Sequence, residues 1–229
     1  MQYLGGKSKI RKQVASVIES YRNPGQEYFE PFVGGGWVLQ EVTGKRTAAD
    51  GNAALISLYV ALQNGWEPPD FVSEEEWRFW RESADMNNPM KAFCGFGCSF
   101  GGKWFGGYAR SDEKSCYAAT SKRSLLKQLP LIRDVTFLHG DFTDWTPEGM
   151  LIYCDHPYAG TTNYGAFDGF DTDLFWDTMR RWSERNTVLI SEYSAPEDFT
   201  CVAEFGSRMG LTTNGERPVR TERMFTRLS

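Results

Sequence analysis

Five consecutive residues combine side chains that could do chemistry on a planar ring: Cys154, Asp155, His156, Pro157 and Tyr158. They end an apolar run that begins LIY, so they stand where a buried strand would finish. A carboxylate accepts hydrogen bonds, and a phenol ring can stack on a flat group. One interpretation is an ordinary capped turn, and the other is a pocket that holds a planar base. The rest of the sequence has to decide between them.

Three other positions also follow predicted strands. The triple glycine at 34–36 follows EYFEPFV, Asp50 ends the next strand, and Asp141 follows VTFLHG. In open α/β sheets, ligands bind outside the carboxyl ends of the strands. Glycines let the backbone approach a ligand, and an acid after the second strand can accept from two ribose hydroxyls. Each signal alone is weak, because a triple glycine is a common turn and Asp50 could cap the helix from Asn52.

The order of the predicted elements indicates why these positions should meet. Strands are predicted in FTCVAEFG, in RMFTRL and over residues 27–33, 47–50, 135–138, 150–154 and 187–190. Apolar residues at helical spacing predict helices over residues 8–21, 53–62 and 171–185, with a helix-like segment over 37–42. Strands that alternate with helices are typical of a doubly wound α/β sheet.

The alternation stops between residues 65 and 130. The stretch CGFGCSFGGKWFGGYAR contains six glycines and cannot form a regular helix, and a helix is predicted near residues 121–132. We therefore divide the chain into an α/β domain, residues 1–64 and 131–229, and an inserted, mainly helical and loop region, residues 65–130.

Charge is distributed unevenly, although the formal net charge of the chain is -5. Residues 67–85 hold seven acids against two bases, whereas residues 101–133 hold seven bases against two acids. A basic segment in an acidic chain is a candidate contact surface for a polyanion, and the alternative is ordinary surface charge. Aromatic residues lie among the glycines beside these bases. They either stack on nucleobases or pack on their own core, and we expect contact with nucleic acid.

The composition disfavours several classes of protein. With 41% hydrophobic and 15% aromatic residues, the chain can build a core and disorder is not expected. The sequence has no apolar stretch long enough for a membrane span and no signal-peptide pattern, so we expect a cytoplasmic protein. Five cysteines suit a reducing compartment. Cys94 and Cys98 form a C-x3-C pair, but a structural zinc site usually needs four ligands, so we expect no metal.

In combination, these motifs resemble the Dam-type (D12 class, alpha group) DNA adenine-N6 methyltransferases. The matching stretches are in family order and cover nearly the whole chain: YLGGK (3–7), EPFVGGG (30–36), ADGNAALISLY (49–59), GDF (140–142), CDHPY (154–158), LISEY (189–193) and NGERPVRTERMF (214–225). The insertion falls where this family carries its target-recognition region. The resemblance implies a Rossmann-like methyltransferase sheet, S-adenosylmethionine as cofactor and DNA as partner, with no membrane and no obligatory protein partner.

The resemblance also implies roles for individual residues. Asp155, His156, Pro157 and Tyr158 would hold the target base. Contacts with the cofactor would come from Tyr3, Lys7, Pro31, Phe32, Gly34, Gly36, Asp50, Asp141, Phe142 and Asp155. Among the bases of the insertion, the candidate phosphate contacts are Lys103, Arg110, Lys122 and Arg123.

The chemistry explains these residue types. An exocyclic amino group is a poor nucleophile because its lone pair is delocalised into the ring. Asp155 and the carbonyl of His156 could each accept one amino hydrogen, which favours a pyramidal nitrogen aimed at the sulfonium methyl. Transfer then needs proximity and in-line geometry more than a strong base. The base must first leave the duplex, and Tyr158 would stack on it.

His156 departs from the family, which usually has a second proline at this position. It is a tolerated variant, adds a substrate contact or marks a weakened enzyme, and we favour the first because Asp155, Pro157 and Tyr158 remain. A binding protein without catalysis is supported by His156 alone. Methylation of cytosine N4 needs the same chemistry but more often goes with serine at the first position of the motif. Methylation of a protein amide usually goes with asparagine there, so Asp155 favours adenine.

Overall fold

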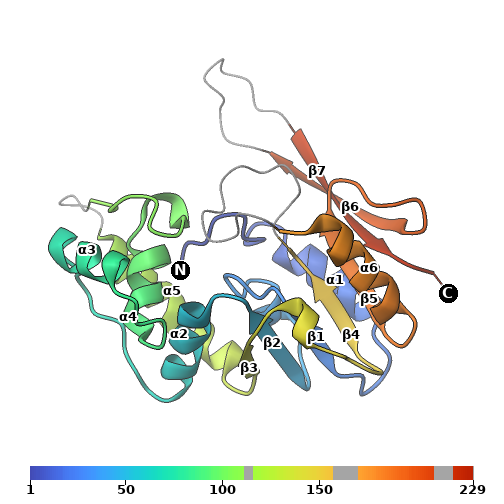
Figure 1. Ribbon diagram of the computed structural model, residues 1–229, viewed down its shortest axis with the longest axis horizontal. Helices are drawn as coiled ribbons and strands as arrows, with labels where there is room; N and C mark the ends of the chain where they lie inside the picture. The colour runs from blue at the N-terminus through green and yellow to red at the C-terminus, as the bar shows by residue number, and fades with distance from the viewer. Residues whose placement is uncertain (111–115, 157–169, 209–218, 229) are drawn as a thin grey trace.

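A computed structural model describes residues 1–110, 116–156, 170–208 and 219–228 of the chain (Figure 1). Its centre is a seven-stranded sheet in the order β3-β2-β1-β4-β5-β7-β6. The first five strands in this order are parallel, and β7 is antiparallel to both β5 and β6. The strands are β1 (Tyr28–Glu30), β2 (Arg46–Asp50), β3 (Thr136–His139), β4 (Leu151–Cys154), β5 (Thr187–Glu192), β6 (Thr200–Arg208) and β7 (Val219–Thr226). The prediction of a mixed, Rossmann-like α/β sheet is confirmed.

Both faces of this sheet are buried, as parallel strands between helices require. Successive side chains of β4 point to opposite faces, so Tyr153 belongs to one core cluster and Ile152 to the other. The helices of the α/β part are α1 (Arg11–Ser20), α2 (Ala53–Gln63) and α6 (Thr172–Ser183). In α6, the fully buried Phe175 and Met179 pack into the cluster of Ile152. Trp176 and Trp182 of the same helix are also buried, whereas Leu174 is exposed.

The inserted region is helical. Its elements are α3 (Glu74–Glu82), α4 (Pro89–Ala92), the π-helical turn η2 (Phe93–Gly97), the 3-10 turn η3 (Phe100–Gly102) and α5 (Tyr117–Ile132). In Figure 1 its green helices lie on the opposite side of the molecule from the red strands β6 and β7. Its residues Trp77 and Phe93 belong to the same core cluster as Leu55 and Tyr59 of α2. The inserted region thus shares its core with the α/β part.

Several elements differ in extent from the sequence expectation, and β1 (Tyr28–Glu30) is shorter than the strand predicted over residues 27–33. Residues 37–42, predicted as helix-like, form only the short 3-10 turn η1 (Leu39–Glu41). Helix α5 begins at Tyr117, before the predicted 121, and β7 begins at Val219, before the predicted 223. The glycine-rich stretch forms no regular α-helix, as predicted, and Gly101 and Gly102 adopt positive φ angles there. Among the described residues, no helix is long and apolar enough to cross a membrane.

Candidate active site

The carboxyl ends of three neighbouring strands bring the predicted site together. Strand β1 lies between β2 and β4. The glycine turn after β1 is therefore flanked by Asp50 at the end of β2 and by Asp155 directly after β4. This is the edge at which open α/β sheets bind ligands.

The glycine turn has no room for side chains. Gly34 and Gly36 have φ angles of 45° and 64°, which L side chains rarely adopt. A Cβ at Gly34 would lie 2.9 Å from the Tyr3 ring, and one at Gly36 would lie 2.9 Å from Nε2 of Gln128. Tyr59 Oη donates to the Gly34 carbonyl at 2.8 Å, and Gln128 Nε2 donates to the Gly36 carbonyl at 2.9 Å. The turn is thus a fixed backbone surface against which Tyr3 packs.

Asp50 connects the end of β2 to this turn. Its Oδ2 accepts from the Gly34 N–H at 3.0 Å and its Oδ1 accepts from the Asn52 N–H at 2.9 Å. The residue is buried. Burial raises the pKa of Asp50 to about 6, and the hydrogen bonds from Asn52 and Gly34 only partly oppose the rise. Each oxygen of a carboxylate can accept more than one hydrogen bond, so this position remains compatible with ribose hydroxyls.

The raised pKa of Asp50 predicts a pH dependence of stability. An unfolded Asp titrates near pH 3.9. Because the pKa is higher in the folded state, this group's contribution to the free energy of unfolding falls as pH rises from about 4 to about 6 and is constant above that. Asp50→Asn should remove a contribution on the order of 2–3 kcal/mol across this window, measured by urea unfolding at each pH.

Asp198→Asn is the matched control. The hydrogen bond from Arg180 lowers the pKa of Asp198, so its contribution to stability is lost as pH falls, in the opposite direction. Wild-type and Asp50→Asn curves that stay parallel between pH 4 and 6 would contradict the prediction.

Lys7 is the centre of the site. Its Nζ donates to Asp155 Oδ1 at 2.6 Å and to Glu222 Oε1 of β7 at 2.8 Å. The Lys7 side chain is 6% exposed, that of Asp155 19% and that of Glu222 11%. Burial alone would lower the pKa of Lys7, but the two carboxylates outweigh it and raise the pKa, so the lysine stays charged. We refer to Lys7, Asp155 and Glu222 as the Lys7 triad.

The imidazole of His156 is turned into the core. Its side chain is 1% exposed and stacks on Phe175 with ring centroids 3.8 Å apart. Its Nε2 lies 3.3 Å from Glu192 Oε2, and Phe32 is also within ring-contact distance. This burial favours a tolerated variant over an imidazole that contacts the substrate. The remaining motif residues, Pro157 and Tyr158, lie outside the described residues.

Two further predicted cofactor residues lie beyond β3. Asp141 is exposed and caps the turn η4 (Phe142–Asp144) by accepting from the Thr143 N–H at 3.0 Å. Phe142 is buried and contacts Phe32, with ring centroids 5.5 Å apart. Phe32 and Phe142 are therefore in contact, and Pro31, which precedes Phe32, is buried.

A cavity of about 580 Å³ lies beside Tyr3, within the range of ligand pockets. It is bordered by the N-terminal segment and the start of α5, and none of the described residues that line it is Asp, Glu, Lys or Arg. The lining supplies aromatic rings and hydroxyls: Tyr3, Ser8, Trp37, Tyr117, Thr120, Ser121 and Ser124. Such a surface suits an uncharged ring of nucleoside size.

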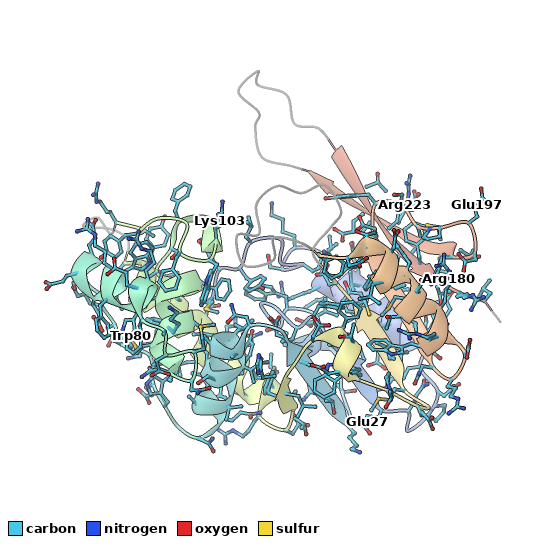
Figure 2. All side chains as sticks on the ribbon, viewed as in Figure 1. Glu27, Trp80, Lys103, Arg180, Glu197 and Arg223 are labelled. Atoms are coloured by element: carbon cyan, nitrogen blue, oxygen red, sulfur yellow. The ribbon has the colours of Figure 1, made fainter. Side chains whose placement is uncertain are left out.

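Two of the four candidate phosphate contacts form ion pairs with acids of the segment 67–85. Lys122 Nζ lies 3.0 Å from Asp70 Oδ2, and an Arg110 nitrogen lies 3.5 Å from Glu74 Oε2. Arg123 donates to the Thr120 hydroxyl, and Lys103 projects from the inserted region in Figure 2. The basic and acidic segments therefore lie together, so the local charge is more balanced than the sequence suggests.

Most aromatics of the glycine-rich stretch pack on the protein's own core, which favours the second of the two interpretations for them. Phe96 is buried and Trp104, Phe105 and Tyr108 are partly buried, and all four pack on or within one core cluster. Trp77 of α3 covers Phe105, with ring centroids 5.4 Å apart. Phe100 is the exception at 70% exposure. The alternative of a loop packed on its own core holds for the other four.

The residues at the sheet edge fit S-adenosylmethionine. The glycine turn provides a backbone surface without side chains, and Asp50 can accept from ribose hydroxyls. The Lys7 triad places two carboxylates with one ammonium, which suits a positively charged sulfonium. Within the described part of the chain, no group of three or more His, Cys, Asp or Glu is placed to hold a metal ion.

Sequence comparison gives a family match for the N-terminal part. Residues 3–90 match the family described as D12 class N6 adenine-specific DNA methyltransferase. This segment contains Tyr3, Lys7, the glycine turn and Asp50. The match supports methyl transfer with S-adenosylmethionine as the cofactor. No curated protein sequence matches the chain.

Comparison with solved structures finds proteins that are similar at low sequence identity. A Pyrococcus horikoshii protein provisionally described as an RNA methyltransferase is 10% identical, with a TM-score of 0.42 over 96% of this chain and 82% of that chain. The precorrin 8w decarboxylase of Methanobacterium thermoautotrophicum is 10% identical, with a TM-score of 0.42 over 96% and 90%. The Escherichia coli protein yhhF, provisionally described as a methyltransferase, is 9% identical, with a TM-score of 0.41 over 97% and 87%. Likeness at this level carries no information about substrate.

Sequence reasoning missed three residues that support the site. Gln128 and Tyr59 bind the carbonyls of the glycine turn from helices distant in sequence, and no local pattern indicates this. Glu222 did have a signal. It alternates with Met224 on β7, so it shares the face of that strand that enters the core. A carboxylate in register with a core methionine indicates a buried partner.

Proposed function

We propose that this protein transfers a methyl group from S-adenosylmethionine to the N6 amino group of adenine in DNA. The observation that carries the proposal is the ion pair between Lys7 and Asp155, which joins the YLGGK segment to the CDHPY segment at the edge where the glycine turn lies. The match of residues 3–90 to a family of this specificity supports the choice of adenine and DNA.

In the proposed reaction, Asp155 orients the amine. Lys7 holds Oδ1 of Asp155, and we assign Oδ2 to accept one amino hydrogen while the carbonyl of His156 accepts the other. The bound cofactor supplies an electrophilic methyl group on a sulfonium. The amino nitrogen gains the methyl group, the S–CH₃ electron pair stays on sulfur, and one amino proton leaves to Asp155 or solvent. Such a site works by positioning and electrostatics.

Access to the amine requires that the target base leaves the duplex, because pairing shields the exocyclic nitrogen. The cavity beside Tyr3 offers room for a nucleoside-sized group. Phe100, which is exposed on the glycine-rich stretch, is the aromatic side chain that we assign to base contact.

The test is methyl transfer to DNA. Purified protein and S-adenosylmethionine are incubated with unmethylated DNA, and the DNA is digested to nucleosides for mass spectrometry. We expect N6-methyladenine. If N4-methylcytosine formed instead, the protein would be a cytosine-N4 methyltransferase. Absence of any methylated base on duplex and single-stranded DNA, with cofactor binding intact, would contradict the proposal and favour an inactive binder.

The proposed DNA surface predicts a change in salt dependence. Replacing Lys103, Arg110, Lys122 and Arg123 together with Gln should weaken DNA binding. The slope of log K against log salt should fall by about 0.9 for each phosphate that no longer meets a basic side chain, and so by about 3–4 in total. The control replaces four basic residues outside the inserted region with Gln: Lys45, Arg180, Arg185 and Arg227. Fluorescence anisotropy at several salt concentrations measures both slopes, and equal slopes would rule out the inserted region as the phosphate surface.

A further inference from the structure

The Lys7 triad contains one carboxylate more than the proposed reaction requires. Asp155 orients the amine and Lys7 holds Asp155, yet Lys7 also binds Glu222 at 2.8 Å. Glu222 comes from β7, where it pairs in register with Phe205 of β6. It is 11% exposed, so keeping its charge has a desolvation cost. A costly second carboxylate needs a reason beyond holding Lys7.

The net charge of the Lys7 triad supplies a reason for the second carboxylate. One ammonium and two carboxylates sum to a single negative charge, whereas Lys7 and Asp155 alone would be neutral. The neighbouring acids Glu30 and Glu192 do not change this difference in net charge between the site with Glu222 and the site without it. Burial raises the pKa of Glu30 well above its usual value, and its Oε2 accepts a hydrogen bond from Tyr28 Oη at 2.8 Å. Glu192 has its own contacts, to His156 Nε2 and to the Tyr193 N–H.

We propose that Glu222 sets the preference of the site for the charged methyl donor over its neutral demethylated product. The inference rests on the proposed use of S-adenosylmethionine and extends it. S-adenosylmethionine and S-adenosylhomocysteine differ by one methyl group and one positive charge on sulfur. Residues that bind the adenosine or amino acid parts contact both molecules alike, so they add little to the difference in affinity.

Position makes Glu222 suited to this role. Asp155 must lie close to the reacting amine and hence to the methyl group that it receives. Glu222 is connected to Asp155 through one lysine nitrogen, by contacts of 2.6 and 2.8 Å. A unit charge in a partly buried site interacts with a nearby cation far more strongly than it would in water. After transfer the sulfur is neutral, the attraction disappears, and the product is released more readily.

The test is a pair of affinities measured without DNA. Isothermal titration gives the dissociation constants of S-adenosylmethionine and S-adenosylhomocysteine for wild type, Glu222→Gln and Glu204→Gln. Gln keeps an oxygen that can accept from Lys7 and removes only the charge. Glu204 is the matched control, since it lies on the neighbouring strand β6 and pairs with Arg223 at 2.8 Å on the surface.

We expect Glu222→Gln to weaken binding of the charged donor by about tenfold, the order for one unit charge at such a site, and to leave the neutral product within about twofold. Glu204→Gln should change neither. Equal loss of both affinities, or loss of neither, would overturn the inference and leave the proposed function standing. A wild type that binds neither molecule would overturn the proposed function itself.

A second measurement needs no variant. Sinefungin carries an amine in place of the S-methyl group, so it is cationic at the same position. The wild type should bind sinefungin about tenfold more tightly than the neutral thioether. Equal affinity would overturn the inference even if Glu222→Gln failed to fold.

Discussion

Asp155→Asn should reduce methyl transfer at saturating cofactor by about a thousandfold while the protein keeps its fold. The substitution preserves shape but replaces an ionised acceptor by an amide, which holds an amino hydrogen less strongly. Loss of one aligned group at a reacting centre typically costs about 10²–10³ in rate. Lys7 retains Glu222 as a partner, so no buried charge is left unpaired. The measurement is the single-turnover rate of DNA methylation at saturating cofactor.

Asp198→Asn serves as the control for this prediction. Asp198 also pairs with a base, since its Oδ2 lies 2.8 Å from Arg180 Nε, but it lies on the surface away from the sheet edge. Its activity should stay within about twofold of wild type, as expected for an exposed pair. If Asp155→Asn kept a tenth of the activity, the carboxylate would have no direct part in transfer.

Lys7→Met should have the largest effect on stability. It leaves two partly buried carboxylates next to each other without their cation. Breaking a buried ion pair by removing one partner costs about 3–5 kcal/mol, because the remaining charge stays desolvated. We expect a loss of this size in the free energy of unfolding, measured by denaturant titration, together with loss of methyl transfer.

Lys45→Met is a close control. Lys45 also pairs with a glutamate, Glu27, at a similar distance of 2.7 Å, but its side chain is 78% exposed. Surface pairs contribute about 0–1 kcal/mol, so this variant should lose less than about 1 kcal/mol. Equal losses for Lys7→Met and Lys45→Met would show that the Lys7 triad is not a buried ion cluster in solution.

The strands of the parallel part were predictable because their apolar runs are short and end in glycine or acid. Predicted residues 150–154 correspond to Leu151–Cys154, and 47–50 to Arg46–Asp50. The antiparallel β7 was less predictable. Its first half, VRTER, is polar, so the pattern indicated only residues 223–228, and Glu222 fell just outside.

Side-chain direction was the main limit for the site. From the sequence, His156 could point to the substrate or to the core, and only the stack on Phe175 decides between them. The packing of the aromatics beside the glycines could not be predicted for a similar reason. Trp77 lies 28 positions before Phe105, and no local pattern indicates that α3 covers the stretch. Contacts between distant segments depend on the fold, which short motifs do not encode.

The position of β7 has a consequence for how the protein is made. Lys7 is synthesised before every strand of the sheet, whereas Glu222 is made with β7, which lies between β5 and β6, both made before it. At about 5–20 residues per second, Lys7 waits roughly ten seconds or more for Glu222. A nascent chain can fold β1, β2 and β4 with Lys7 against Asp155, but the second carboxylate arrives only when β7 inserts. The order of translation therefore completes the charge that we assign to donor recognition only after strands β1–β6 have been made.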